Sequence, residues 1–235
     1  MINGDISVYF SSSESVTRQT DHHAVTLGLK YIFANLLLTT KNFDLENQIS
    51  AFSKSVKARN ASLTVYARVT LALQSTDRVS ALIESTIPRL RQNPLVECLA
   101  IRPATDAQFV ELLSQPSHYD LLSVDVSNGS FFQQSFACSK ALKSAPQNVV
   151  VEVELSQTLR GSTELINLIS QSKLVFTKTG KVVVSSGAKS VFEMKSSLDM
   201  TNWATNILKL RRPRHTLDRL SDLVAKRRSL IGNYY

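Results

Sequence analysis

Glycine, proline and cysteine are all scarce in this chain of 235 residues, which holds 7 glycines, 6 prolines and 2 cysteines. So little glycine and proline argues against a low-complexity or disordered chain. The two cysteines, Cys98 and Cys138, exclude a disulfide framework and a Cys-rich zinc site, although they are enough for one bridge. We expect a reducing compartment, with both thiols buried in the core because their surroundings are apolar.

Long apolar runs and targeting segments are missing as well. The most apolar stretch, Tyr31–Leu38, is far shorter than the roughly 20 residues that cross a bilayer. Residues 1–13 contain no basic residue, unlike a signal or transit peptide. We therefore expect a soluble, intracellular protein with no membrane partner.

The usual signatures of nucleotide and metal sites are also absent. Neither G-x-G-x-x-G nor G-x-x-x-x-G-K-[ST] occurs, which removes the default nucleotide-binding loop. The motif Asp21-His22-His23-Ala24 matches the signature of a phosphoesterase family. His22 and His23 are adjacent on a predicted helix, however, and point about 100° apart, so we predict ordinary surface histidines. Asp125 and Glu154, at predicted strand ends, leave an acid/base pair open as an alternative.

Short apolar runs alternate with segments of helical periodicity along the first 208 residues. The predicted strands are Asp5–Phe10, Tyr31–Leu38, Leu63–Leu71, Val96–Arg102, Tyr119–Val126, Asn148–Leu155 and Lys181–Ser185. The predicted helices are Thr17–Leu27, Asp44–Ala58, Asp77–Leu90, Asp106–Leu113, Phe131–Leu142, Thr163–Gln171 and Leu198–Leu208.

Several residues mark the ends of these helices. Asp77 and Asp106 stand where an acidic residue favours a helix start, and Gly28 suits a helix end. Ser196 and Asp199 have the spacing of a capping box before the last helix, so we expect Asp199 to cap it with Ser185 and Ser186 facing it from a strand end.

Repeated strand–helix units predict parallel strands joined by right-handed crossovers, in a doubly wound sheet or a barrel. The size, just below that of an eight-fold barrel, favours an irregular (β/α) TIM-like barrel. We therefore predict an α/β protein with a barrel over residues 1–208 and a basic, helical C-terminal extension over residues 209–235.

The positive charge is concentrated in that extension. Residues 209–235 hold eight basic and two acidic residues, so +6 of the formal net charge of +8 lies there. This predicts phosphate contacts with a nucleic acid, although a solvated face or a nuclear-localisation signal would look the same. The RNA-binding residues that we predict in the extension are Arg211, Arg212, Arg214, Lys226, Arg227 and Arg228.

One segment, Lys181 to Asn202, closely resembles a block in the TIM-barrel protein subunit of eukaryotic RNase P and RNase MRP. That block is an apolar strand followed by Ser-Ser, two small residues, an acidic residue, an aliphatic residue, Arg or Lys, and later Asp-Val. The residues that fit are Ser185, Ser186, Ala188, Glu193, Lys195, Asp199 and Asn202. Gly187 and Val191 depart from the commoner Ala and Pro. A weaker likeness spans residues 4–208, with Tyr119–Val124 resembling a "YD" strand and Arg68 inside the third strand.

The resemblance implies a barrel related to the polymerase-and-histidinol-phosphatase metal hydrolases that has lost its metal ligands, with no cofactor and no catalytic residue. It implies a non-catalytic subunit of the particle that removes 5′ leaders from precursor tRNA, in which a non-coding RNA with metal ions is catalytic. The partners would be that RNA, precursor tRNA, a small heterodimer subunit and the other RNase P or RNase MRP subunits.

The same resemblance implies a nuclear, and within it nucleolar, location and a share in rRNA processing through RNase MRP. Lys195 would be a strand-end cation available to a phosphate, or would instead pair with Glu193 or Asp199. Two other functions stay open: a divergent barrel phosphoesterase that uses Asp125 and Glu154, and a barrel that serves only as a protein scaffold.

Overall fold

A computed structural model describes residues 4–9, 14–41, 44–57, 63–125, 135–157 and 181–210, together with residues 163, 166, 169–170 and 175–176. Most of the helix predicted over Thr163–Gln171 lies outside the described residues, as does the basic extension from Arg211 onward. None of the described helices has the length and apolarity that a membrane span needs.

Seven parallel strands form one sheet in sequence order, and each strand overlaps one predicted from the sequence. β4 to β7 are buried along their whole length, as expected for strands that are covered on both faces. The strands are β1 (Gly4–Tyr9), β2 (Tyr31–Thr39), β3 (Thr64–Ala72), β4 (Cys98–Arg102), β5 (Leu121–Val124), β6 (Val151–Glu154) and β7 (Val182–Ser185).

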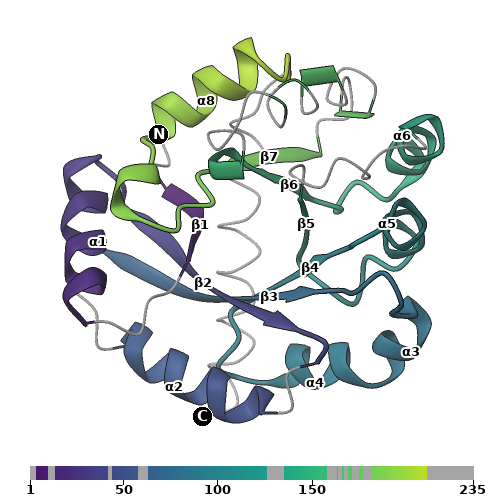
Figure 1. Ribbon diagram of the computed structural model, residues 1–235, viewed down its shortest axis with the longest axis horizontal. Coiled ribbons are helices and arrows are strands. Elements are labelled where there is room, and N and C mark those ends of the chain that lie inside the picture. The colour runs from purple at the N-terminus through teal and green to yellow at the C-terminus, as the bar shows by residue number, and fades with distance from the viewer. Residues whose placement is uncertain are drawn as a thin grey trace.

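The sheet curls into a barrel whose first and last strands meet through the residues that follow β7. Val8 of β1 forms a parallel bridge with Ala188. The backbone N–H of Tyr9 donates to Ala188 O at 2.8 Å, and that of Ala188 to Ser7 O at 3.2 Å. Figure 1 shows the strands as a ring with the helices outside it, which confirms the irregular (β/α) barrel predicted from the sequence.

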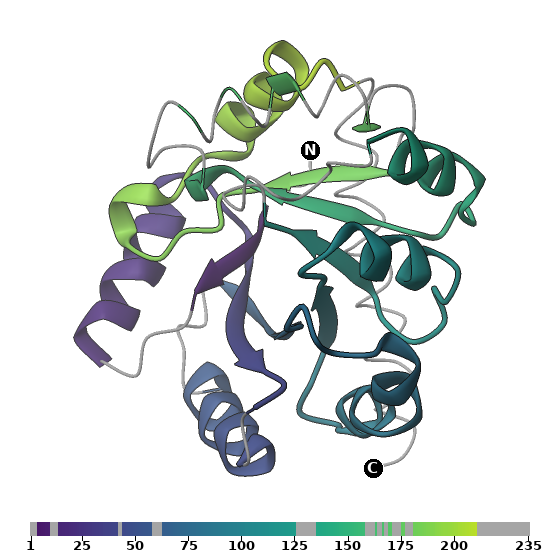
Figure 2. The ribbon, with the colours of Figure 1, turned by 45° about the vertical axis from the view of Figure 1, so that its right-hand side comes forward.

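Helices cover the outside of the ring, as Figure 2 shows from another direction. The largest apolar cluster lies between this layer and the strands and includes Ile49, Phe109 and Met200 from three different helices. The described helices are α1 (Glu14–Thr26), α2 (Leu45–Lys57), α3 (Val79–Glu84), α4 (Thr86–Gln92), α5 (Asp106–Leu113), α6 (Ser135–Ser144) and α8 (Ser197–Asn206).

The helix predicted over Asp77–Leu90 is in fact two short helices that meet at Ser85. Pro88 explains the break, because it has no N–H and its ring collides with the carbonyl of the residue four positions earlier. Asp77 also does not cap this helix. Its Oδ2 accepts hydrogen bonds from the Thr40 hydroxyl at 2.7 Å and from the Gln74 N–H at 2.6 Å.

Two other predicted helix ends agree with the structure. Gly28 has φ +71° directly after α1, a conformation that a glycine adopts without strain. Asp106 lies in the first turn of α5, where Thr105 is the N-cap and accepts a hydrogen bond from the Gln108 N–H. Both cysteines are buried free thiols, as expected, and Trp203 packs half-buried against the main cluster.

Candidate functional site

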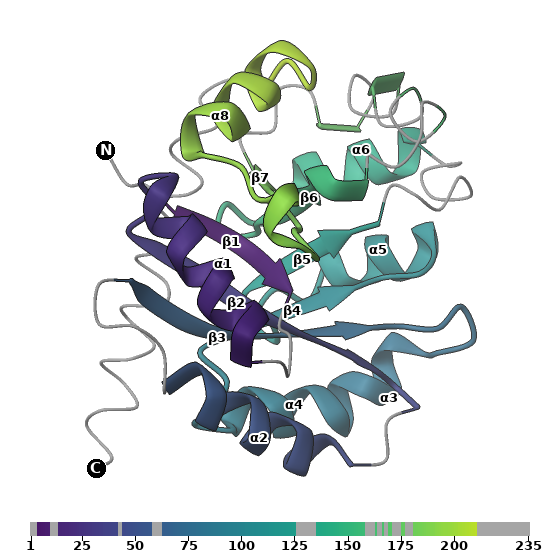
Figure 3. The same ribbon diagram turned by 60° about the vertical axis from the view of Figure 1, so that its left-hand side comes forward.

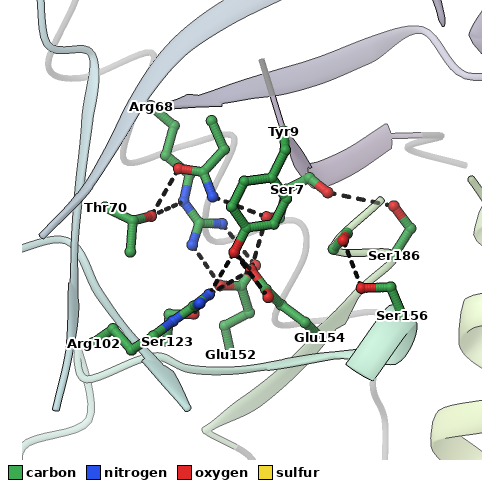
Figure 4. A network of polar contacts seen from close by, with 12 residues as sticks. Ser7, Tyr9, Arg68, Thr70, Arg102, Ser123, Glu152, Glu154, Ser156 and Ser186 are labelled. Atoms are coloured by element: carbon green, nitrogen blue, oxygen red, sulfur yellow. Dashed lines mark hydrogen bonds and ion pairs between the residues drawn. The ribbon is translucent and has the colours of Figure 1, made fainter. Parts of the chain in front are cut away.

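The interior of the barrel changes from apolar to polar along the strands. Alternate residues of each strand point inward. Near the amino ends of the strands the inward side chains form an apolar cluster, in which the rings of Phe33 and Tyr66 stack with centroids 4.8 Å apart. Near the carboxyl ends they are polar (Figure 4): Ser7, Tyr9, Asn35, Arg68, Thr70, Arg102, Ser123, Glu152 and Glu154.

The deepest charges in this interior are Arg68 of β3 and Glu152 of β6, whose side chains are both 0% exposed. Their contact is bidentate, with Nη1 to Oε1 at 2.6 Å and Nη2 to Oε2 at 2.5 Å. Nε of Arg68 also donates to the Thr70 hydroxyl at 3.1 Å. Arg68 therefore lies inside the third strand, as the sequence predicted, and its charge is fully paired.

A second ion pair lies nearer the carboxyl ends of the strands. Arg102 Nη2 is 2.8 Å from Glu154 Oε1, and it also donates to the hydroxyls of Tyr9 at 2.8 Å and Ser123 at 3.0 Å. Glu154 accepts further hydrogen bonds from Ser7 Oγ at 3.0 Å and from the Tyr9 hydroxyl at 3.1 Å. This carboxylate is thus surrounded by donors from β1 and β4.

Neutral side chains join the two pairs into one network. The Thr70 hydroxyl donates to Asn35 Oδ1 at 2.8 Å, Asn35 Nδ2 donates to Ser7 Oγ at 3.1 Å, and Ser7 in turn donates to Glu154. We call these nine inward polar residues the interior ion network. Its two arginines and two glutamates balance each other, which meets the requirement that buried charges be paired and hydrogen-bonded.

Burial and pairing act against each other on the charges of the network. Burial alone would raise the pKa of Glu152, but the Arg68 guanidinium outweighs it and lowers that pKa. Burial alone would lower the pKa of Arg68, and the charge of Glu152 raises it instead. Burial and the negative charge of Glu154 raise the pKa of Tyr9. Arg68 and Glu152 therefore remain ionised, and Tyr9 remains a neutral donor.

The chain after β7 closes over this network. Gly187 has φ +58°, and a Cβ placed there would lie 2.6 Å from the Cβ of Glu154. The glycine that departs from the family-like block is therefore required by the close approach of the backbone to β6. The Ser186 hydroxyl donates to Ser7 O at 3.3 Å, and the Ser156 hydroxyl donates to Gly187 O at 2.6 Å.

The surroundings of Glu154 argue against the interpretation of Asp125 and Glu154 as an acid/base pair. Glu154 is 1% exposed, and its carboxylate holds Arg102, Ser7 and Tyr9. A general base must reach a substrate proton, and a buried carboxylate already paired with a guanidinium does not. Asp125 follows β5 and is half-buried. Burial alone would lower the pKa of Arg102, but Glu154, Tyr9 and, more weakly, Asp125 raise it instead.

Comparison with known families decides where this barrel belongs. A family model described as RNase P subunit p30 matches residues 3–230, almost the whole chain. The chain belongs to this family. Membership makes the protein a component of RNase P with a role in tRNA processing, and it implies association with the RNase P RNA and precursor tRNA.

Solved structures of similar shape agree with the fold of this p30-family subunit. A histidinol phosphate phosphatase from Lactococcus lactis, solved with zinc, L-histidinol and phosphate, has a TM-score of 0.50 and 10% identity over 96% of this chain and 94% of that one. At this identity the likeness shows the fold alone. A D-hydantoinase from a Bacillus species reaches 0.42 and 12% over 78% of this chain and 46% of that one, which is too distant for any argument. A search of the curated proteins gave no match.

The residues of this subunit do not fit a metal centre of the kind that the phosphatase carries. The two interior carboxylates each face a guanidinium, which repels a metal cation. Among the described residues, no three His, Cys, Asp or Glu side chains converge as metal ligands would. His22 is exposed and His23 half-buried on α1, so both lie on a helix surface as predicted.

Two expectations about the family-like block need correction. The N-cap of α8 is Ser196, whose hydroxyl accepts a hydrogen bond from the Asp199 N–H at 3.1 Å and donates to Asp199 Oδ2 at 2.7 Å. The predicted capping-box spacing of Ser196 and Asp199 is therefore confirmed, but Asp199 orients the cap rather than forming it. Ser185 does end β7, but Ser186 faces Ser7 of β1 rather than α8, because the chain turns inward at Gly187.

The sequence predicted Lys195 at a strand end. The structure places it instead in the connection to α8, where it is half-buried. Glu193 and Asp199 are the two partners expected for an ion pair with Lys195. Glu193 Oε2 accepts a hydrogen bond from the Lys189 N–H at 2.7 Å, and Asp199 Oδ2 accepts one from the Ser196 hydroxyl at 2.7 Å. Asn202 lies exposed on α8. The predicted RNA-binding residues of the extension, Arg211, Arg212, Arg214, Lys226, Arg227 and Arg228, lie outside the described residues.

The sequence reasoning missed the role of Lys181. This side chain is buried, and its Nζ donates to the carbonyls of Leu142 at 2.8 Å and Ala145 at 2.5 Å, at the end of α6. A lysine at a helix carboxyl end satisfies free carbonyls and complements the helix dipole. Burial lowers its pKa. The only signal in the sequence is a lone lysine at the start of an apolar strand.

Proposed function

We propose that this protein is a non-catalytic subunit of RNase P that supports 5′-leader removal from precursor tRNA by binding RNA and partner subunits. The observation that carries the proposal is the interior ion network. Arg68 and Arg102 hold both interior glutamates at the end of the barrel where such folds place their chemistry. Membership of the RNase P subunit p30 family supports the ribonucleoprotein setting.

RNA contacts of this protein are proposed for Lys195 and for the two basic clusters of the extension. The clusters are Arg211, Arg212 and Arg214, and Lys226, Arg227 and Arg228. Cations of this kind neutralise phosphates and release counterions, which gives affinity without sequence discrimination. The barrel over residues 1–208 would bind partner subunits, while the extension over residues 209–235 would follow the RNA backbone.

Cleavage assays with the purified protein test the non-catalytic role. Alone, it should cleave neither precursor tRNA nor phosphate monoesters, whereas it should support leader removal when the RNA and the other subunits are present. The alternative, a divergent phosphoesterase, predicts metal-dependent turnover that Asp125→Asn or Glu154→Gln abolishes. Turnover lost in the partly exposed Asp125→Asn, with an unchanged circular dichroism spectrum, would refute the proposal without relying on the buried Glu154.

The basic clusters are tested by changing each triplet to alanine and measuring RNA affinity at several salt concentrations. Each phosphate that the variant no longer neutralises should reduce the slope of log affinity against log salt by about 0.7 to 0.9. The weakening should be similar for unrelated structured RNAs, since all carry phosphates. A localisation signal predicts the opposite result, with unchanged slopes and reduced nuclear accumulation of the same variants.

The share with RNase MRP, the small heterodimer partner and the nucleolar location also belong to this proposal. Affinity purification followed by RNA sequencing and mass spectrometry tests the two partner claims, and imaging of the tagged protein tests the location. Recovery of two structured non-coding RNAs with other small basic proteins would support a shared subunit with a role in rRNA processing. Recovery of one RNA would restrict the protein to RNase P, and recovery of none would refute the ribonucleoprotein role.

A further inference from the structure

Phe192 is the most exposed large apolar side chain of the described residues, at 92%. It lies in the 3-10 turn Val191–Glu193, between β7 and α8. Figure 3 shows this segment on the outside of the barrel beside α1 and before α8. A phenylalanine with this exposure adds almost nothing to the core, so its ring is open to a ligand from outside the barrel.

The segment that carries Phe192 is anchored on both sides. Ala188 pairs with Val8, and Met194 is 3% exposed in an apolar cluster with Ala24 of α1. Within the turn, the Met194 N–H donates to Val191 O at 3.3 Å. The ring is therefore presented on a fixed backbone, so binding of a ligand that covers it costs little ordering entropy in this segment.

The surroundings of Phe192 are polar and include two lysines and one glutamate of the same segment. The glutamate, Glu193, is half-buried, and its Oε2 accepts a hydrogen bond from the Lys189 N–H at 2.7 Å. Lys189 and Ser190 are exposed, and Lys195 is half-buried. The Lys189 Nζ lies 5.4 Å from the centroid of the Tyr9 ring, which holds this ammonium at the end of β1. Proteins that bind unpaired nucleotides combine aromatic rings, on which bases stack, with cations that meet the phosphates. Phe192 with Lys189 and Lys195 provides both kinds of group on one short segment.

We propose that Phe192 is a stacking platform for an unpaired base of RNA, with Lys189 and Lys195 binding the adjacent phosphates. The proposal rests on the RNA-binding function proposed above and assigns to the barrel, rather than to the extension, a preference for single-stranded RNA. Paired bases offer no free ring face except at duplex ends, so a duplex gains little from this ring.

The test measures fluorescence anisotropy of the full-length protein with single-stranded oligoadenylate and with an RNA duplex. Phe192→Ala should weaken binding of the single strand by roughly 5- to 150-fold and leave duplex binding unchanged. Phe192→Trp should retain affinity because it keeps a ring, whereas Phe192→Leu, which keeps only apolarity, should lose it. Phe136→Ala is the matched control, because Phe136 on α6 is also 83% exposed.

Three results would overturn the platform, and they are distinguishable. If the wild-type protein binds neither RNA, the proposed RNA-binding function fails together with the platform. If it binds both RNAs and Phe192→Ala binds the single strand equally well, only the platform fails. A third result would identify the surface as a protein contact. In that case Phe192→Ala binds the single strand with unchanged affinity, but Phe192→Ala and Leu198→Ser each recover fewer particle proteins in affinity purification. Leu198 serves here because it is also exposed, at 60%.

Discussion

Removing Arg68 should destabilise the barrel more than any surface change, because it leaves a fully buried carboxylate without its counterion. Arg68 and Glu152 are both 0% exposed and share two short hydrogen bonds. Breaking a buried pair by removing one partner costs about 3–5 kcal/mol. We therefore expect Arg68→Met to lower the free energy of unfolding by about 3–5 kcal/mol at pH 7.

Replacing both partners should restore much of this stability. The double variant Arg68→Met/Glu152→Leu removes the unpaired charge and keeps the volume apolar, and such replacements are often neutral or stabilising. We expect its free energy of unfolding to lie within about 1 kcal/mol of the wild-type value or above it. The coupling energy of the two positions is the difference between the loss of unfolding free energy in the double variant and the sum of the losses in the two single variants.

The destabilisation in Arg68→Met should also depend on pH. In the wild-type protein Arg68 lowers the pKa of Glu152, so the stabilisation by this group is present above its unfolded pKa of about 4.3 and is lost as pH falls through the folded pKa. Without Arg68, burial raises the pKa of Glu152, so the variant loses stability as pH rises. The gap between the two proteins should therefore be widest near pH 7 and narrow toward pH about 4.

Urea unfolding at both pH values, followed by circular dichroism, measures these free energies. The reasoning about the network is refuted if Arg68→Met lies within about 1 kcal/mol of wild type at pH 7, below the range for a broken buried pair. It is equally refuted if the gap between variant and wild type does not change with pH.

Three further predictions concern single positions. Ser196→Ala should cost about 1 kcal/mol in thermal unfolding, and Asp199→Ala less, because Ser196 is the N-cap of α8; a larger cost for Asp199→Ala would reverse these roles. Gly187→Ala should lower the free energy of unfolding clearly more than Gly28→Ala. Both glycines have positive φ, but a Cβ at position 187 would collide with the buried Glu154, while Gly28 faces open space. Equal losses in the two variants would contradict the close approach at Gly187. Lys181→Met should cost about 1–3 kcal/mol in urea unfolding, because carbonyls at the end of α6 lose their donor, and an unchanged urea midpoint would show that they find another.

The barrel is predictable from the chain because its signals are local. Runs such as Tyr31–Leu38 are apolar on both faces, and all seven predicted strands occur in the structure. Helix ends that depend on neighbouring residues, such as Gly28 after α1, are also predictable. The break between α3 and α4 within Asp77–Leu90 also has a local cause, because Pro88 interrupts the helix. The apolar periodicity continues through Pro88, which is why the sequence predicts one helix there.

The sequence held only a partial signal for the interior ion network. Glu152 and Glu154 alternate with valines in a strand, and Arg68 is a lone charge in an apolar run. Charged residues are almost never buried unless paired, so each of these predicts a partner somewhere in the fold. No pattern along the chain identifies that partner, because Arg68 and Glu152 are 84 residues apart.

The sequence by itself determined which segments become strands and helices, since apolar periodicity and terminal residues act over a few positions. It also indicated, through the block Lys181 to Asn202, the family to which the chain belongs. Only the tertiary structure decided what the interior charges do. Closing the ring turns the inward side chains of β1, β3 and β6 toward one another, so that Arg68 meets Glu152 and Tyr9 meets Glu154. The physical reason is that a buried charge is stable only beside an opposite one, and which charges become neighbours depends on how the strands pair around the barrel.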